Sequence, residues 1–99
     1  DNKKKKYGYQ AAQLCAINII GQVNSAVNGN ISKISQCINL GGFVNSKDNF
    51  QNHADVINGA SDLICSIFKI KGIHTRFAVG VNSLPLNASV EINSIFTLK

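Results

Sequence analysis

Apolar residues recur at steps of three and four along the first part of the chain, which is the spacing of one helix face. The stripe contains Ala12, Cys15, Ala16, Ile19, Ile20, Val23 and Val27, and it continues in phase through Ile31, Ile34 and Ile38. The dipeptide Asn28-Gly29 is a strong turn signal and allows two helices. The unbroken phase instead favours one long helix kinked near Gly29, since a glycine inside a helix costs only about 1 kcal/mol.

A second stripe has the same period and predicts a second helix. It contains Phe50, Ala54, Ile57, Ala60 or Ser61, Ile64 and Phe68. Between the stripes, Gly41-Gly42 is the clearest stop signal, because glycine takes the left-handed conformation that ends many helices. We therefore expect residues 9–70 to form an antiparallel helical hairpin that turns at this pair, with Gly21 and Gly59 allowing close packing.

The period changes to two after Gly72. Phe77, Val79 and Val81 alternate with small residues, Val90 and Ile92 alternate with polar ones, and a turn cluster at 82–87 surrounds the only proline. Residues 71–99 are thus expected to form a β-hairpin or an extended arm. Because an isolated hairpin is marginal in water, the arm must lie on the helices or on a partner. The fold class predicted is mainly α.

Length and charge change this picture little. Ninety-nine residues make one domain. Of the formal charge of +5, four lysines at 3–6 and Asp1 contribute +3, so residues 1–8 are predicted to be a basic tail. The most apolar runs fall well below the ~20 residues of a membrane-spanning helix, so no transmembrane segment is expected.

The three cysteines favour an oxidising compartment. Cys15 and Cys37 would differ in height by roughly 9 Å about a turn at Gly29, too much for a disulfide. Cys15 and Cys65 each lie 25 residues from Leu40 and therefore fit a turn there. We expect a Cys15–Cys65 disulfide, with Cys37 free or linked to another chain.

No constellation predicts catalysis. Neither His53 nor His74 has the neighbouring nucleophile and orienting group that a dyad needs. No Cys/His pair has zinc spacing, and no glycine-rich loop has the context of a phosphate site, so neither metal nor cofactor is expected. Nucleic-acid binding would rest on Lys3 to Lys6 alone, and it is not expected.

The run Cys15-Ala16-Ile17-Asn18-Ile19-Ile20-Gly21, followed by Cys37 and by a second helix with Cys65, resembles a cysteine pattern of dinoflagellate and related algal proteins. The resemblance covers about residues 12–66, and Phe43 stands where a fourth cysteine would fall. It implies a helical hairpin, and a small lumenal subunit bound to a photosystem or its antenna.

The function that these observations favour is a non-catalytic accessory subunit of a larger complex, in the thylakoid lumen or secreted. Its lysine tail would contact an acidic protein or an anionic membrane surface. The docking residues expected are Lys3, Lys4, Lys5, Lys6, Phe77, Val79 and Val81. The alternatives are a small secreted carrier or effector of an apolar ligand and, less favoured, a cationic membrane-active peptide.

Overall fold

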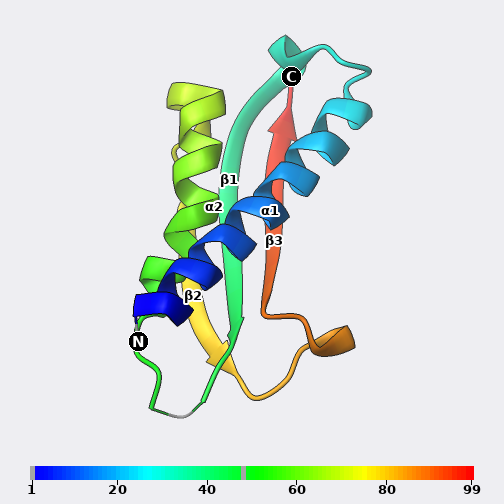
Figure 1. The fold of residues 1–99 in the computed structure, drawn as a ribbon. Helices are drawn as coiled ribbons and strands as arrows, with labels where there is room; N and C mark the ends of the chain where they lie inside the picture. The colour runs from blue at the N-terminus through cyan, green and yellow to red at the C-terminus, as the bar shows by residue number, and fades with distance from the viewer. Residues whose placement is uncertain (1, 48) are drawn as a thin grey trace.

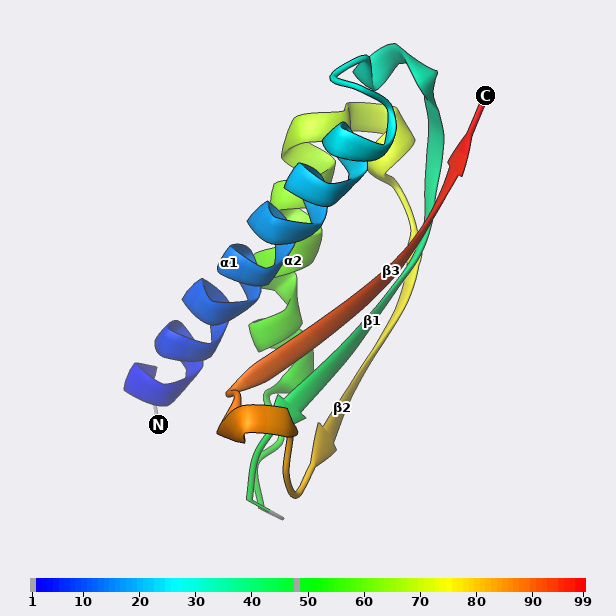
Figure 2. The same ribbon diagram turned by 90° about the vertical axis from the view of Figure 1, so that its right-hand side faces the viewer.

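The computed structural model describes residues 2–47 and 49–99, with side chains from Lys5 onward. It is an α+β fold in which two helices cover one face of a three-stranded mixed sheet (Figures 1 and 2). The helices are α1 (Asn2–Ala26) and α2 (His53–Phe68). The strands are β1 (Ile34–Asn45), β2 (Thr75–Val81) and β3 (Val90–Leu98). The prediction of a mainly α hairpin is therefore wrong.

β1 is the central strand, and it pairs with both others. It runs parallel to β2, with Asn39 opposite Thr75, and antiparallel to β3, with Val44 opposite Val90. Parallel neighbours need a long crossover, which α2 supplies. The predicted hairpin of residues 71–99 does not form, because β1 lies between its two strands.

Two bulges explain why β1 resembles a helix in the sequence. Register shifts between Ile34 and Gln36 and between Cys37 and Asn39 each place an extra residue in β1. Each bulge delays the alternation of faces by one position. The fully buried residues of this half of the strand are consequently Ile34, Cys37 and Leu40, spaced by three.

The turn at Asn28-Gly29 ends the first helical segment. Both residues have positive φ, 53° and 78°, so the chain reverses there and the single long helix does not form. The segment that precedes it is helical from residue 2, so the described part of the predicted basic tail, residues 2–8, belongs to α1. The side chains of Lys3 and Lys4 lie outside the described residues.

The glycines predicted as a turn lie inside β1. The side chain of Ile57 in α2 occupies the space above Gly42, so close that a Cβ there would lie 2.5 Å from Ile57 Cδ1. Phe77 and Asn93 crowd Gly41 in the same way on the opposite face. These glycines are needed for close approach on the two faces of the sheet, a recognised role of glycine in strands.

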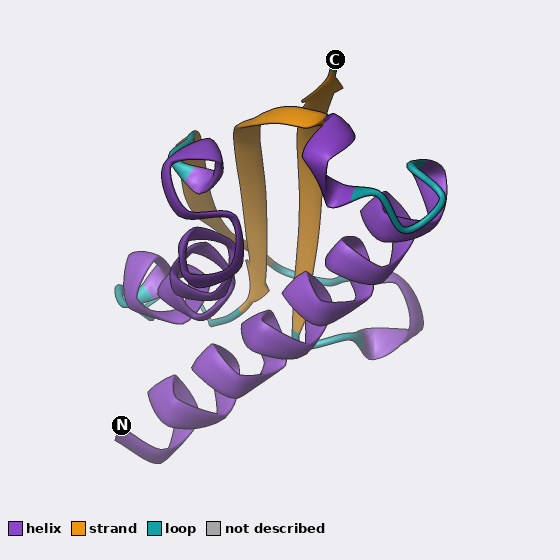
Figure 3. Ribbon diagram, turned by 90° about the horizontal axis from the view of Figure 1, so that it is seen from above, coloured by secondary structure: helices purple, strands orange, loops and turns teal. Residues whose placement is uncertain are grey.

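The view from above shows both helices on the same side of the sheet (Figure 3). The core of buried side chains comes from α1, α2 and the sheet. α1 supplies Ala12 and Ala16, while α2 supplies Val56, Ile57, Ala60, Ile64 and Phe68. Four residues of the predicted second stripe, Ile57, Ala60, Ile64 and Phe68, thus lie on the buried face of α2, whereas Ala54 is exposed and Phe50 precedes the helix. Among the described residues, no helix combines the length and apolar character needed to cross a membrane.

All three cysteines are free thiols, so the expected Cys15–Cys65 disulfide is absent. Cys15 Sγ lies 3.8 Å from the Val90 carbonyl oxygen, whereas Cys65 Sγ donates to Gly72 O at 3.5 Å. The two sulfurs thus face different elements. The structure gives the expected oxidising compartment no support.

We expect Gly42→Ala to lower the free energy of unfolding by about 1–3 kcal/mol, because its Cβ would overlap the fully buried Ile57. Gly21→Ala is the matched control, since its Cβ would meet nothing within 4 Å and helical alanine is favoured by about 0.5–1 kcal/mol. Urea denaturation measures both. A Gly42→Ala variant as stable as the parent would contradict this packing.

A second prediction concerns Cys37. Burial, with a smaller contribution from Cys65, raises the pKa of the Cys37 thiol from its ordinary 9.0 to about 11. Because the folded pKa is raised, the thiol's contribution to stability is complete below pH 9 and is lost as the pH rises through 11. We expect N-ethylmaleimide at pH 7.5 to label half-buried Cys15 and Cys65 well before Cys37.

The Cys37→Ala variant tests the pH dependence, because it should lose less stability than the parent between pH 9 and pH 11. Equal losses in the two proteins, or labelling of Cys37 as fast as that of Cys15, would show that this thiol is not sequestered.

Candidate functional site

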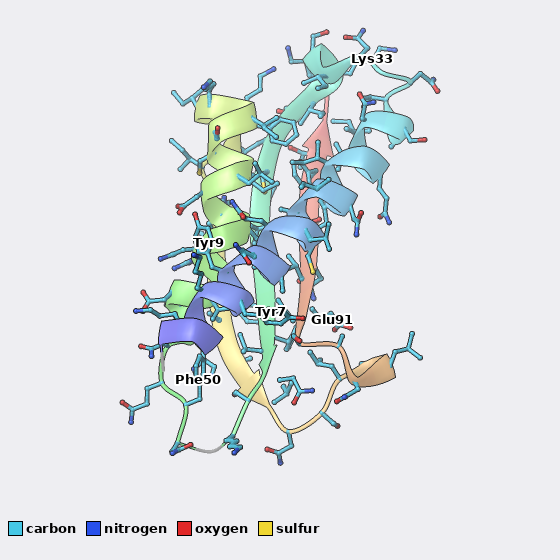
Figure 4. All side chains as sticks on the ribbon, viewed as in Figure 1. Tyr7, Tyr9, Lys33, Phe50 and Glu91 are labelled. Atoms are coloured by element: carbon cyan, nitrogen blue, oxygen red, sulfur yellow. The ribbon has the colours of Figure 1, made fainter. Side chains whose placement is uncertain are left out.

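An open apolar pocket of about 570 Å³ lies where the N-terminal half of α1 passes over the carboxyl end of β1. Its volume falls in the ordinary range of small-molecule sites. Figure 4 labels two of its aromatic residues, Tyr7 on α1 and Phe50 on the segment before α2. The residues that line it are Tyr7, Gly8, Val44, Asn45, Ser46, Lys47, Phe50, Val56, Ser89 and Val90.

A smaller polar hollow of about 260 Å³ adjoins this pocket and shares Ser46, Lys47 and Phe50 with it. His53, the first residue of α2, and Gly80 of β2 also line this hollow. The apolar pocket therefore opens directly beside a histidine, a lysine and a hydroxyl group.

Two backbone hydrogen bonds position these side chains, one between strands and one within a turn. Ser46 N donates to Val81 O at 3.1 Å, which continues the β1–β2 pairing past the end of β1. Phe50 N donates to Lys47 O at 3.1 Å and closes the turn that leads to α2. The turn brings Ser46 back against the start of the helix.

Ser46 and His53 form a hydroxyl–imidazole pair. Ser46 Oγ lies 3.3 Å from His53 Nε2, and the Phe50 ring meets the imidazole edge-on with 5.1 Å between centroids. Both groups press against Gly80, where a Cβ would lie 2.5 Å from His53 Nε2 and 2.7 Å from Ser46 Oγ. The absence of a side chain at position 80 is thus required for the pair to lie against β2.

The other histidine also has a serine partner. His74 Nε2 lies 3.0 Å from Ser61 Oγ of α2, and its Nδ1 contacts the Gly72 carbonyl oxygen. Arg76 Nη1 donates to the same Ser61 Oγ at 3.1 Å. This cluster lies along the α2–β2 side of the molecule, eight residues of helix away from His53.

The described acids of α2 are engaged by α1. Asp55 pairs with Lys5 Nζ at 3.8 Å, and Asp62 accepts a 2.9 Å hydrogen bond from the Tyr9 hydroxyl. That hydrogen bond raises the pKa of Tyr9. Among the described residues, no group of three His, Cys, Asp or Glu side chains is placed to hold a metal ion.

The predicted docking residues have different surroundings. Phe77 and Val79 lie on the sheet face opposite the helices, 42% and 41% exposed, where Phe77 packs edge-on against Phe43. Val81 is half-buried and lines the polar hollow. Their role in docking stays a prediction. The sequence analysis missed the serines and Arg76. A turn brings Ser46 to His53, and the packing of α2 on the sheet brings Ser61 to His74 and Arg76.

Comparison with known proteins finds relatives for nearly the whole chain. A family model described as "YjgF/chorismate mutase-like, putative endoribonuclease" matches residues 2–97. Protein TCP17 of Trypanosoma cruzi is 40% identical over 92 residues, which are 92% of this chain and 57% of that protein.

Two solved structures are similar in both sequence and fold. The chain superposes on protein Atu1372 of Agrobacterium tumefaciens with a TM-score of 0.93 at 48% identity, over 96% of this chain and 60% of that one. A putative endoribonuclease of Shewanella oneidensis gives a TM-score of 0.89 at 32% identity, over 95% and 62%. The chain thus spans about three-fifths of the length of these relatives.

These similarities overturn the resemblance to algal cysteine-patterned proteins, and with it the photosystem subunit and the secreted carrier. The cysteine pattern that suggested it belongs to two helices and a bulged strand with three unpaired thiols. The match over nearly the entire chain shows that the protein belongs to the YjgF/chorismate mutase-like family.

Proposed function

We propose that this protein cleaves single-stranded RNA at the polar hollow, with a nucleobase held in the adjoining apolar pocket. The main support for the proposal is that the apolar pocket and the polar hollow share a wall. In that wall, Phe50 and Lys47 lie beside the Ser46–His53 pair. The family description and the name of the Shewanella relative, both "putative endoribonuclease", support the choice of substrate.

Stacking is the means of binding a base. Phe50 is half-buried and Tyr7 is 64% exposed at the pocket wall, so both rings offer surface to a planar ligand. A base stacked on an aromatic side chain gains about 1–3 kcal/mol with little dependence on sequence. The pocket therefore suits a base without selecting one strongly.

The chemistry assigned to the hollow is attack by a ribose 2′-hydroxyl on the adjacent phosphorus. His53 Nε2 takes the 2′-hydroxyl proton while the bond from O2′ to phosphorus forms and the bond to O5′ breaks. The proton then passes from His53 to the leaving O5′. The products are a 2′,3′-cyclic phosphate and a 5′-hydroxyl end.

A lysine and the N-terminus of a helix favour the binding of a phosphate in the hollow. Lys47 lines both spaces, and His53 lies at the N-terminus of the 16-residue helix α2, where backbone N–H groups favour an anion. Ser46 is a positioning residue in this scheme: its hydroxyl contacts His53 Nε2 in the absence of RNA, and the ribose 2′-hydroxyl takes its place at that nitrogen when the strand binds.

The proposal departs from two expectations, that the protein is not an enzyme and that it does not bind nucleic acid. Both rested on histidines without partners and on lysines confined to the N-terminus. The structure gives each histidine a serine partner, and it places Lys47 beside an aromatic pocket.

We expect His53→Gln to lower kcat on a uridine-rich RNA oligonucleotide by about 10²–10⁴-fold, the usual contribution of a general base. The all-DNA and 2′-O-methyl versions should remain intact, because they lack the attacking hydroxyl. Gly80→Ala should lower kcat at least tenfold, since its Cβ displaces His53 Nε2 and Ser46 Oγ, while the nearest atoms to position 80 include neither aromatic ring of the base pocket.

Fluorescent end-labelled substrates and mass spectrometry of the products measure these effects. Preparing His53→Gln in parallel also controls for contaminating nucleases. Cleavage by His53→Gln at the parent rate, or equal cleavage of RNA and DNA, would contradict the proposed reaction.

A further inference from the structure

The cluster of Ser61, His74 and Arg76 is the strongest feature that the proposed reaction does not use. It joins the middle of α2 to the start of the edge strand β2. Arg76 is exposed, and Ser61 and His74 are half-buried, so the group is open to solvent on one side.

The hydrogen bonds fix the roles of these groups. A carbonyl oxygen can only accept, so His74 Nδ1 must donate to Gly72 O, and in the neutral ring Nε2 then accepts from Ser61. The Ser61 oxygen in turn accepts from Arg76 Nη1. One of the five guanidinium N–H groups holds Arg76 against α2.

No acidic side chain among the described residues neutralises the charge of Arg76. It forms no ion pair with a described residue, and the described acids of α2, Asp55 and Asp62, contact Lys5 and Tyr9 of α1 instead. Lys69 and Lys71 precede the cluster in the sequence, in the short 3₁₀ segment Lys69–Gly72, and add to the positive charge of this part of the chain. A fixed guanidinium with free donors matches the geometry of a phosphate group.

We propose that Ser61, His74 and Arg76 form a second phosphate subsite, which holds the RNA strand a few nucleotides from the bond being cleaved. This rests on the proposed function. Arg76 binds the phosphate oxygens, while Ser61 and His74 keep its guanidinium in place. The competing explanation is a structural brace between α2 and β2 that binds no ligand.

The spacing sets the length of RNA that reaches both sites. His53 and Ser61 are eight residues apart in α2, which is about 12 Å at a rise of 1.5 Å per residue. A stacked strand rises about 3.4 Å per nucleotide, so the two sites are three to four nucleotides apart. A dinucleotide is too short to occupy both.

Binding is measured separately from cleavage with non-cleavable 2′-O-methyl oligouridines of two and six nucleotides. We expect Arg76→Gln to weaken hexamer binding about tenfold, the effect of losing a charged hydrogen bond, and to leave dimer binding within twofold. The slope of log affinity against log salt for the hexamer should fall by about 0.7, the value for one phosphate contact on a single strand.

Two further variants separate binding from bracing. Lys33→Gln removes the same charge beside the start of β1, at the opposite end of the molecule from Phe50 (Figure 4), and it should leave both affinities unchanged. Ser61→Ala keeps Arg76 but removes its support, so it should weaken the hexamer less than Arg76→Gln does. Thermal unfolding reports any loss of bracing independently of salt.

The outcomes are distinct. An unchanged hexamer affinity or salt slope in Arg76→Gln, or equal weakening of dimer and hexamer, overturns the subsite. Titration of inorganic phosphate, followed by the NMR chemical shift of His74, tests the other source of the ligand. If phosphate saturates the shift at the same concentration as the hexamer does, the site binds free phosphate, and the subsite is overturned. Arg76-dependent hexamer binding without RNA cleavage supports the subsite while refuting the proposed reaction.

Discussion

The approach of α2 to the central strand at Gly42 determines how the rest of the molecule is assembled. Ile57 fills the space that a side chain at this position would take, and it is fully buried there. Leu40 and Val44 extend the same contact along β1. With α2 set at this depth, its first residue reaches the end of β1 and its middle reaches β2. Both serine–histidine pairs therefore depend on the close approach at Gly42, and the Ser46–His53 pair depends on Gly80 as well.

The helices and strands differ in how far the sequence reveals them. The face of α2 follows a regular period of 3.6, and Ile57, Ile64 and Phe68 are buried as that period requires. The bulges give β1 a burial spacing of three, so periodicity alone could not separate it from a helix. Gly41-Gly42 then reads as a turn, although tertiary contacts on both faces are the cause of these glycines.

The candidate site was even less visible in the sequence. The histidines could be named, but Ser46 reaches His53 only across a turn and Ser61 reaches His74 only across the helix–sheet interface. No short motif encodes either pair. The expected disulfide failed for a related reason, since the equal spacing of Cys15 and Cys65 from Leu40 has meaning only if the chain turns there. The charge analysis assigned most of the net positive charge to residues 1–8, and it gave no reason to single out Arg76.

The central position of β1 also bears on how the chain acquires its structure. Its antiparallel partners lie between 46 residues away, for Val44 and Val90, and 64 residues away, for Ile34 and Leu98. Contacts this distant in sequence close large loops, and such topologies fold slowly compared with local hairpins. During synthesis, β1 is complete while neither neighbouring strand has yet been made. An apolar strand with two open edges can then pair with other chains, so it is a target for aggregation until β2 and β3 emerge.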